Sequence, residues 1–213
     1  MPTADQILAS LKEISNSWTS IAIFWHIYFA VLAVTLMSGK RLSKQIHGIL
    51  LGIPLLSVSI LAWAYSNPFN GIVFAVVGIA LIYVSSKLPR DAIQIGPLWM
   101  IIMGVALFMF GWIYPHFLDT TTFLTYVYAA PTGIIPCPTL SIVIGLALIT
   151  NGLNSRKFSY ILGFTGIFYG IFGVVRLGVS IDLVLLFGAV ILIAVAIRIK
   201  NKDIKNEIGK QNA

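Results

Sequence analysis

Charged residues are scarce in this sequence. Only 10% of its 213 residues are Asp, Glu, Lys or Arg, while 58% are hydrophobic, and a soluble domain carries roughly 25% charged residues. A chain so short of charge cannot cover a water-facing surface, which excludes an ordinary soluble domain. The net charge of +7 does not indicate a nucleic-acid surface, because the basic residues stand in loops and the tail without interleaved aromatic residues.

Cysteine and histidine are rarer still, with only Cys137, His26, His47 and His116. A single cysteine excludes an internal disulfide, and no two of the four residues have the spacing of metal ligands on one helix. A metal site made by Cys137 and His116 stays conceivable, with His26 as a third ligand if this residue lies close enough to the outer side of the membrane. The sequence also lacks a Ser-His-Asp arrangement, a phosphate loop and paired carboxylates. We therefore expect no enzyme activity, no cofactor and no resident metal.

Long apolar runs dominate the chain instead. Each is about 20 residues, long enough to cross a bilayer as a helix. They predict a single all-α integral membrane domain over 1–213, a polytopic bundle of about seven transmembrane helices. An interfacial segment at 1–17 and a polar cytoplasmic tail at 200–213 flank a bundle at 18–199. The expected spans are 18–38, 46–65, 71–87, 97–114, 139–153, 159–178 and 181–199.

Basic residues gather on one side of these spans. The opposite side has only Lys12, with Arg176 near the end of a span. Because loops rich in Lys and Arg stay in the cytoplasm, we expect the N-terminus outside and the C-terminus inside a prokaryotic cell membrane, with the lipid bilayer as partner. The crowded side carries Lys40, Arg41, Lys44, Lys87, Arg90, Arg156, Lys157, Arg198, Lys200, Lys202, Lys205 and Lys210.

The first 17 residues lack the basic start of a signal peptide. Their apolar residues fall on one helical face, and Thr3 and Gln6 have the spacing of a capping box. We expect a short amphipathic helix on the outer membrane surface. A frayed tail is the alternative, since isolated helices of this length are marginal in water. The apolar face consists of Ile7, Leu8, Leu11, Ile14 and Trp18.

Three prolines break the pattern at "YAAPTGIIPCPTLSI" and place Cys137 between Pro136 and Pro138. Proline removes a backbone donor, so the fifth span should start here, with Pro138 or Thr139 in its first turn and Thr139 capping the exposed amides. The preceding segment, 123–135, is too short to span. It is either a re-entrant element beside a wet cavity or a plain outer loop.

Arg176 and Asp182 flank the next connection on that side, "RLGVSID". Ionisable residues at membrane depth point to function, although an ion pair across the turn is the simpler interpretation. Together with the proline block they form a candidate substrate or pore site. Its members are Pro136, Cys137, Pro138, Thr139, Arg176 and Asp182.

Glycines mark the sixth span at intervals of three, four and three residues. They form one stripe along a helix, which lets a neighbouring helix approach closely. The stripe consists of Gly163, Gly166, Gly170 and Gly173, and Gly48 and Gly52 make a shorter version in the second span.

The block "TGIIPCPTLSIVIGLALI" resembles the hallmark of a prokaryotic membrane family, domain of unknown function 6064. The leader "MPTADQIL", the turn "SNPFNGIVFAVVGIAL" and the connection "RLGVSIDLVLL" are similar to further pieces of that family in the same order. The resemblance implies a multi-span membrane protein and no established activity.

Three functions fit these features. The first is a small-solute or ion transporter or channel-like protein with an outer-side site at the proline block, which we prefer because broken segments recur at transporter sites. The second is a scaffold that packs on other membrane proteins, or on a second copy, through its glycine stripe. The third is a thiol or metal-handling protein that uses Cys137.

Overall fold

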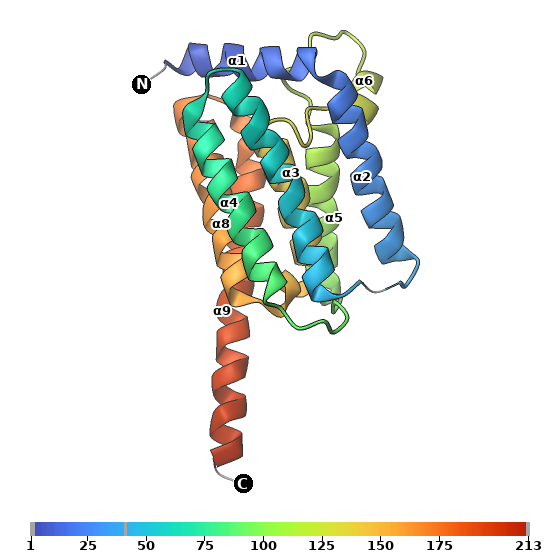
Figure 1. Ribbon diagram of the computed structural model, residues 1–213, viewed down its shortest axis with the longest axis vertical. Coiled ribbons are helices and arrows are strands. Elements are labelled where there is room, and N and C mark those ends of the chain that lie inside the picture. The colour runs from blue at the N-terminus through green and yellow to red at the C-terminus, as the bar shows by residue number, and fades with distance from the viewer. Residues whose placement is uncertain (1–2, 41, 212–213) are drawn as a thin grey trace.

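A computed structural model describes residues 3–40 and 42–211, so that Arg41 lies outside the described residues. The protein is 79% helical, and the described residues form no strand. One helix, α1 (Ala4–Ser17), lies across one end of a bundle of roughly parallel helices, and α9 extends beyond the opposite end (Figure 1).

The bundle helices lie close to the spans expected from the sequence. Short elements join them: α6 (Leu124–Ala129), η1 (Asn151–Asn154), the π-helical turn η2 (Phe172–Arg176) and η3 (Ser180–Asp182). The long helices are α2 (Thr19–Met37), α3 (Lys44–Ala64), α4 (Pro68–Ser86), α5 (Leu98–Ile113), α7 (Pro136–Ile149), α8 (Arg156–Ile171) and α9 (Leu183–Gln211), the last running helical through the predicted polar tail.

Five segments are long and apolar enough to cross a membrane, namely α2, α3, α4, Arg156–Arg176 and Ser180–Ile199. The prediction of an all-helical chain is confirmed, and the length and composition of these five segments of the described chain fit a multi-pass membrane protein. The number seven stays a prediction because α5 and α7 are shorter. Large apolar side chains cover the outside of the bundle. Met37 is 86% exposed and Val175 79%, which suits a surface that faces lipid rather than water.

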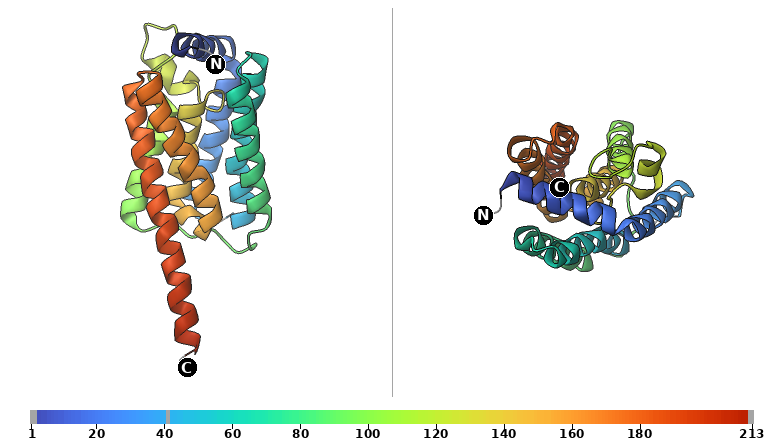
Figure 2. Two further views of the ribbon diagram at one scale, coloured as in Figure 1. Left: turned by 90° about the vertical axis from the view of Figure 1, so that its left-hand side faces the viewer. Right: turned by 90° about the horizontal axis from the view of Figure 1, so that it is seen from above.

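The helix α7 forms the core. All of its 14 residues except Cys137 and Ile149 are buried, by packing on α5, α8, α9 and α3 (Figure 2). At 1.5 Å per residue it is about 21 Å long, less than the roughly 30 Å of a hydrocarbon core. Its apolar character therefore reflects burial in protein.

Backbone-to-backbone contact holds α5 against α7. A Cβ atom on Gly104 would lie 2.6 Å from the Gly145 carbonyl oxygen, and one on Gly145 would lie 2.6 Å from the Gly104 oxygen. Two helical turns further along, a Cβ on Gly111 would lie 2.6 Å from the Pro138 oxygen. These three glycines, which the sequence pattern did not single out, let the two helices touch.

The predicted glycine stripe faces the chain's own α9. Gly163 and Gly166 pack on Ile193 and Ala189 of α9. Gly170 packs on the backbone of Leu186, and Gly173 packs on the Asp182 side chain. Because α9 already fills this stripe, it offers no surface to another protein.

The proline block begins α7 rather than preceding it. Pro136 is the first residue of the helix, where its missing N–H is not needed. Thr139 does not cap the helix as expected: its hydroxyl accepts a hydrogen bond from Gly133 N–H at 2.8 Å and donates to the Ile135 carbonyl at 2.6 Å. Two prolines in the first turn remove two of the donors that a cap would serve, so this threonine is free to bind the preceding turn.

At the end of the bundle opposite α1, a 2.6 Å ion pair joins Lys44, the first residue of α3, to Asp91 in the loop between α4 and α5. The hydrogen bond from Lys44 and its charge lower the pKa of the Asp91 carboxyl below its ordinary value.

Replacing Gly145 by alanine should destabilise the bundle, because the new methyl group has only backbone atoms of α5 to displace. Overpacking of this kind costs about 1–3 kcal/mol, which for a chain of this size lowers the melting temperature by several degrees. Thermal unfolding of the purified protein in detergent measures the shift. Val175→Ala, on the exposed face, is the matched control, and equal melting temperatures would contradict the close contact.

Candidate functional site

Two adjoining cavities lie between α1 and the nearby ends of α4 and α8. The large cavity, of about 330 Å³, is lined by Ile7, Asn67, Phe69, Asn70, Phe168, Phe172 and Arg176. The small cavity, of about 20 Å³, is lined by Ile7, Leu11, Asn70, Pro136, Cys137, Tyr169, Phe172, Gly173 and Leu177. Ile7, Asn70 and Phe172 line both, so the cavities share a wall, and the small one has room for about one water molecule.

Asp182 is the only buried acidic residue in the described part of the chain, with 1% of its surface exposed. The Tyr114 hydroxyl donates a 2.8 Å hydrogen bond to its Oδ1 atom, and the Cys137 side chain contacts the same carboxyl group. The other oxygen, Oδ2, packs on Gly173, where any side chain would overlap it. Among the side chains that the structure describes, those of residues 3–40 and 42–199, no Lys, Arg or His lies within ion-pair distance of Asp182.

The expected ion pair between Arg176 and Asp182 is therefore wrong. The chain turns at Gly178, which has a φ of +70°, and the Val179 N–H donates to the Gly173 carbonyl at 2.9 Å. This turn directs Asp182 into the bundle, while Arg176 stays exposed at the large cavity. A left-handed φ is the conformation that glycine adopts readily.

Four of the six predicted site residues lie around the two cavities. Pro136 and Cys137 line the small one and Arg176 the large one, while Asp182 lies directly behind Gly173 and Cys137. Pro138 and Thr139 line neither cavity. They face the core of the bundle, because the first turn of a helix points successive residues in different directions.

Four polar residues in and behind the cavities were missed by the sequence interpretation: Asn67, Asn70 and Tyr169 line them, and Tyr114 binds Asp182 behind them. Tyr169 donates a 2.8 Å hydrogen bond to Asn70 Oδ1 across 99 residues of sequence, and Tyr114 reaches Asp182 across 68. In the sequence Tyr114 closes an apolar run and Tyr169 stands among glycines. Neither position carries a signal of polar partnership, since the partners come from distant helices.

The helix α1 forms the roof of both cavities through Ile7 and Leu11. Its N-terminus is closed by the predicted capping box, in which Thr3 and Gln6 each bind the other's backbone, so that prediction is confirmed. In the middle of α1, Ser10 Oγ donates to the Tyr65 carbonyl at 3.4 Å.

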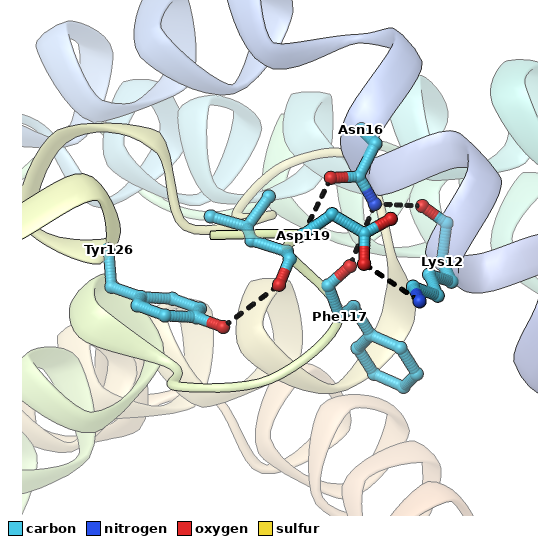
Figure 3. Close-up of polar contacts among 6 residues, drawn as sticks. Lys12, Asn16, Phe117, Asp119 and Tyr126 are labelled. Atoms are coloured by element: carbon cyan, nitrogen blue, oxygen red, sulfur yellow. Dashed lines mark hydrogen bonds and ion pairs between the residues drawn. The ribbon is translucent and has the colours of Figure 1, made fainter. Parts of the chain in front are cut away.

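Asn16 fastens the roof to the loop that follows α5 (Figure 3). Its Nδ2 atom donates to the Phe117 carbonyl at 2.9 Å, and its Oδ1 accepts from Asp119 N–H at 2.8 Å. Lys12 and Asp119 add an ion pair of 2.7 Å, but both side chains are more than half exposed, so this pair contributes little. Asn16 is thus the main attachment on this side.

The conceivable metal site of Cys137, His116 and His26 finds no support. In the described residues, no three His, Cys, Asp or Glu side chains gather as metal ligands would. Both ring nitrogens of His26 are engaged, since they lie 2.8 Å and 3.0 Å from the carbonyl oxygens of Ala22 and Trp112. His47 is fully buried on α3, near the end of that helix that lies away from α1.

Replacing Asn16 by alanine should loosen the roof and expose Cys137. Two hydrogen bonds to the loop are lost, each worth about 1 kcal/mol, so we expect a membrane-impermeant maleimide to label Cys137 roughly thirtyfold faster. Gln94→Ala, an exposed polar residue far from α1, is the control. Equal labelling rates in the two variants would show that α1 does not close the small cavity.

Comparisons of this chain with protein-family models, curated proteins and solved structures found no match. The resemblance of the Pro-Cys-Pro-Thr block to domain of unknown function 6064 therefore stays a prediction, and any functional conclusion depends on the geometry of the two cavities.

Proposed function

We propose that the chain crosses the cell membrane seven times, with α1 outside and the end of α9 in the cytoplasm. The loops at the end opposite α1 join α2 to α3, α4 to α5 and α7 to α8 (Figure 1). In these loops and in the first turns of α3 and α8 that follow them lie the described basic residues Lys40, Lys44, Lys87, Arg90, Arg156 and Lys157. The α1 end has Lys12 and Arg176 alone, and such an imbalance supports this orientation. The short α7 reaches the outer surface through α6 and residues 130–135, which precede it.

Within this membrane protein, Asp182 is proposed to bind and release a proton in a transporter or channel-like function. The observation that supports this role is the environment of the Asp182 carboxyl group. The residue is 1% exposed, it has no basic partner among the described side chains, and a cavity lies on the other side of Gly173. A buried carboxylate without a counter-charge is strongly unfavourable. Such a group must take up a proton or a cation, and acidic residues at membrane depth mark such sites.

The size of the small cavity favours a proton over a larger solute. About 20 Å³ accommodates one water molecule, which can pass a proton to the carboxyl group. Tyr114 donates to the carboxyl at 2.8 Å and holds it in place. A larger solute could enter only if α1 and its Ile7 and Leu11 side chains moved away.

The other two functional classes have less support. A scaffold that packs through the glycine stripe would need that stripe on the surface, but α9 covers it. A thiol or metal function would need a nucleophilic or metal-ligating Cys137. In the described residues, Cys137 and its neighbour Asp182 find no third His, Cys, Asp or Glu side chain to complete a metal site, and the other polar residues at the small cavity are Tyr169 and Asn70, neither of which is a usual metal ligand.

The Asp182→Asn variant tests the proposal, because it keeps the shape of the side chain and removes the proton-binding oxygen. The full chain is reconstituted in liposomes that hold a pH-sensitive dye, and a pH gradient is imposed while valinomycin and K⁺ hold the voltage at zero. We expect the wild-type protein to dissipate the gradient about tenfold faster than this variant, which corresponds to about 1.4 kcal/mol.

Asp119→Asn is the matched control, because Asp119 is an acidic residue at the same end of the bundle but more than half exposed. It should retain the wild-type rate. A wild-type protein that dissipates the gradient no faster than protein-free liposomes would rule out a proton pathway through Asp182.

A further inference from the structure

An open groove runs between α4 and α8 on the outside of the bundle. It begins at the large cavity and continues into a surface hollow of about 330 Å³ lined by Phe69, Val73, Phe164, Thr165 and Phe168. Phe69 and Phe168 line both spaces, so the two form one continuous feature. We refer to it as the α4–α8 groove.

The end of the groove near α1 carries hydrogen-bond donors without acceptors. Arg176 makes no ion pair within the described residues. Asn67 and Asn70 are 7% and 5% exposed, yet neither Nδ2 atom has a hydrogen-bond acceptor in the described chain, because the bonds they make use Oδ1. Both Nδ2 atoms keep some accessible surface in side chains that line the large cavity, so an acceptor bound in that cavity would give them the partners that amide donors normally have.

The backbone adds to this positive end. Asn67 is the N-cap of α4 and Pro68 its first residue, so the positive end of the α4 dipole lies at the same wall of the large cavity. A guanidinium group, two carboxamides and a helix N-terminus together are suited to a phosphate group. Asp182, the nearest buried acid, lies behind Gly173 and does not line this cavity.

The rest of the groove is apolar and aromatic. Phe69 and Phe168 have ring centroids 5.9 Å apart, and Phe168 stacks on Phe172 at 5.9 Å. Phe164, at the far end, is 60% exposed. From Arg176 to Phe164 is twelve residues of one continuous helical segment, about 18 Å at 1.5 Å per residue, which matches the roughly 15 Å depth of one bilayer leaflet.

We propose that the α4–α8 groove binds a membrane lipid with an anionic phosphate headgroup. The phosphate lies at Arg176, Asn67 and Asn70, and one acyl chain follows the phenylalanines toward the middle of the bilayer. The groove has hydrogen-bond donors at one end and an aromatic channel about as long as one leaflet. A lipid would fill both parts, whereas a soluble anion would leave the apolar part empty. This site is separate from Asp182 and does not depend on proton transfer there.

Phosphatidylglycerol and phosphatidylcholine of equal chain length are the probes. The full chain in detergent is titrated with each lipid, and bound lipid is counted by native mass spectrometry. We expect the wild-type protein to bind phosphatidylglycerol about tenfold more tightly than phosphatidylcholine. A tenfold difference in affinity is the size of effect that one charge-assisted hydrogen bond gives. Arg176→Gln should abolish this preference, whereas Lys12→Gln, which removes the other basic residue at this end, should preserve it.

A second variant separates a lipid from a free anion. Val73→Trp blocks the apolar part of the groove without touching the donors, so it should weaken phosphatidylglycerol binding about tenfold. Glycerol phosphate, which has the headgroup and no chain, should not compete at equal concentration. Competition by glycerol phosphate, or unchanged lipid binding in both Arg176→Gln and Val73→Trp, would overturn the proposal. Both variants are first shown to melt at the wild-type temperature.

Discussion

The contact between the backbones of α5 and α7 is the interaction on which the rest of this structure depends. Lipid gives helices no hydrophobic reason to associate, so association depends on how closely they pack. Gly104, Gly111 and Gly145 bring backbone carbonyls of one helix against the other. The surface of α7 that faces away from α5 then packs on α8, α9 and α3. A helix too short to span thus becomes the core that the longer helices surround.

The position of α7 also determines where the site lies. The Pro138 carbonyl packs against Gly111, and Thr132 Oγ1 donates to the Gly111 carbonyl at 2.7 Å, so the start of α7 is held at one depth. Pro136 and Cys137 are therefore the two residues of α7 that line the small cavity. Two prolines in the first turn explain why helix α7 begins there, and no re-entrant passage of the segment before it is needed.

The two ionisable residues of the connection after α8 have different surroundings and different chemistry. Gly173 admits the Asp182 carboxyl into the bundle, and the turn at Gly178 sends Arg176 to the lipid side. Asp182 lies behind Gly173, which lines the small cavity, while Arg176 lines the large cavity from which the aromatic groove continues. If the two had formed the expected ion pair, each would have neutralised the other.

Composition and periodicity alone determined the class of this protein, the positions of its long helices and the capping box of α1, but not the continuation of α9 to Gln211. These are local properties: apolar length predicts a membrane helix, and Thr3 and Gln6 meet within one turn. The proline block and Asp182 also stood out in the sequence as breaks in an apolar pattern. Only the tertiary structure decided that Tyr114 binds Asp182, that Tyr169 binds Asn70, and that the glycine stripe is filled by α9. These contacts join residues of distant helices, and their geometry depends on how the whole bundle packs around α7.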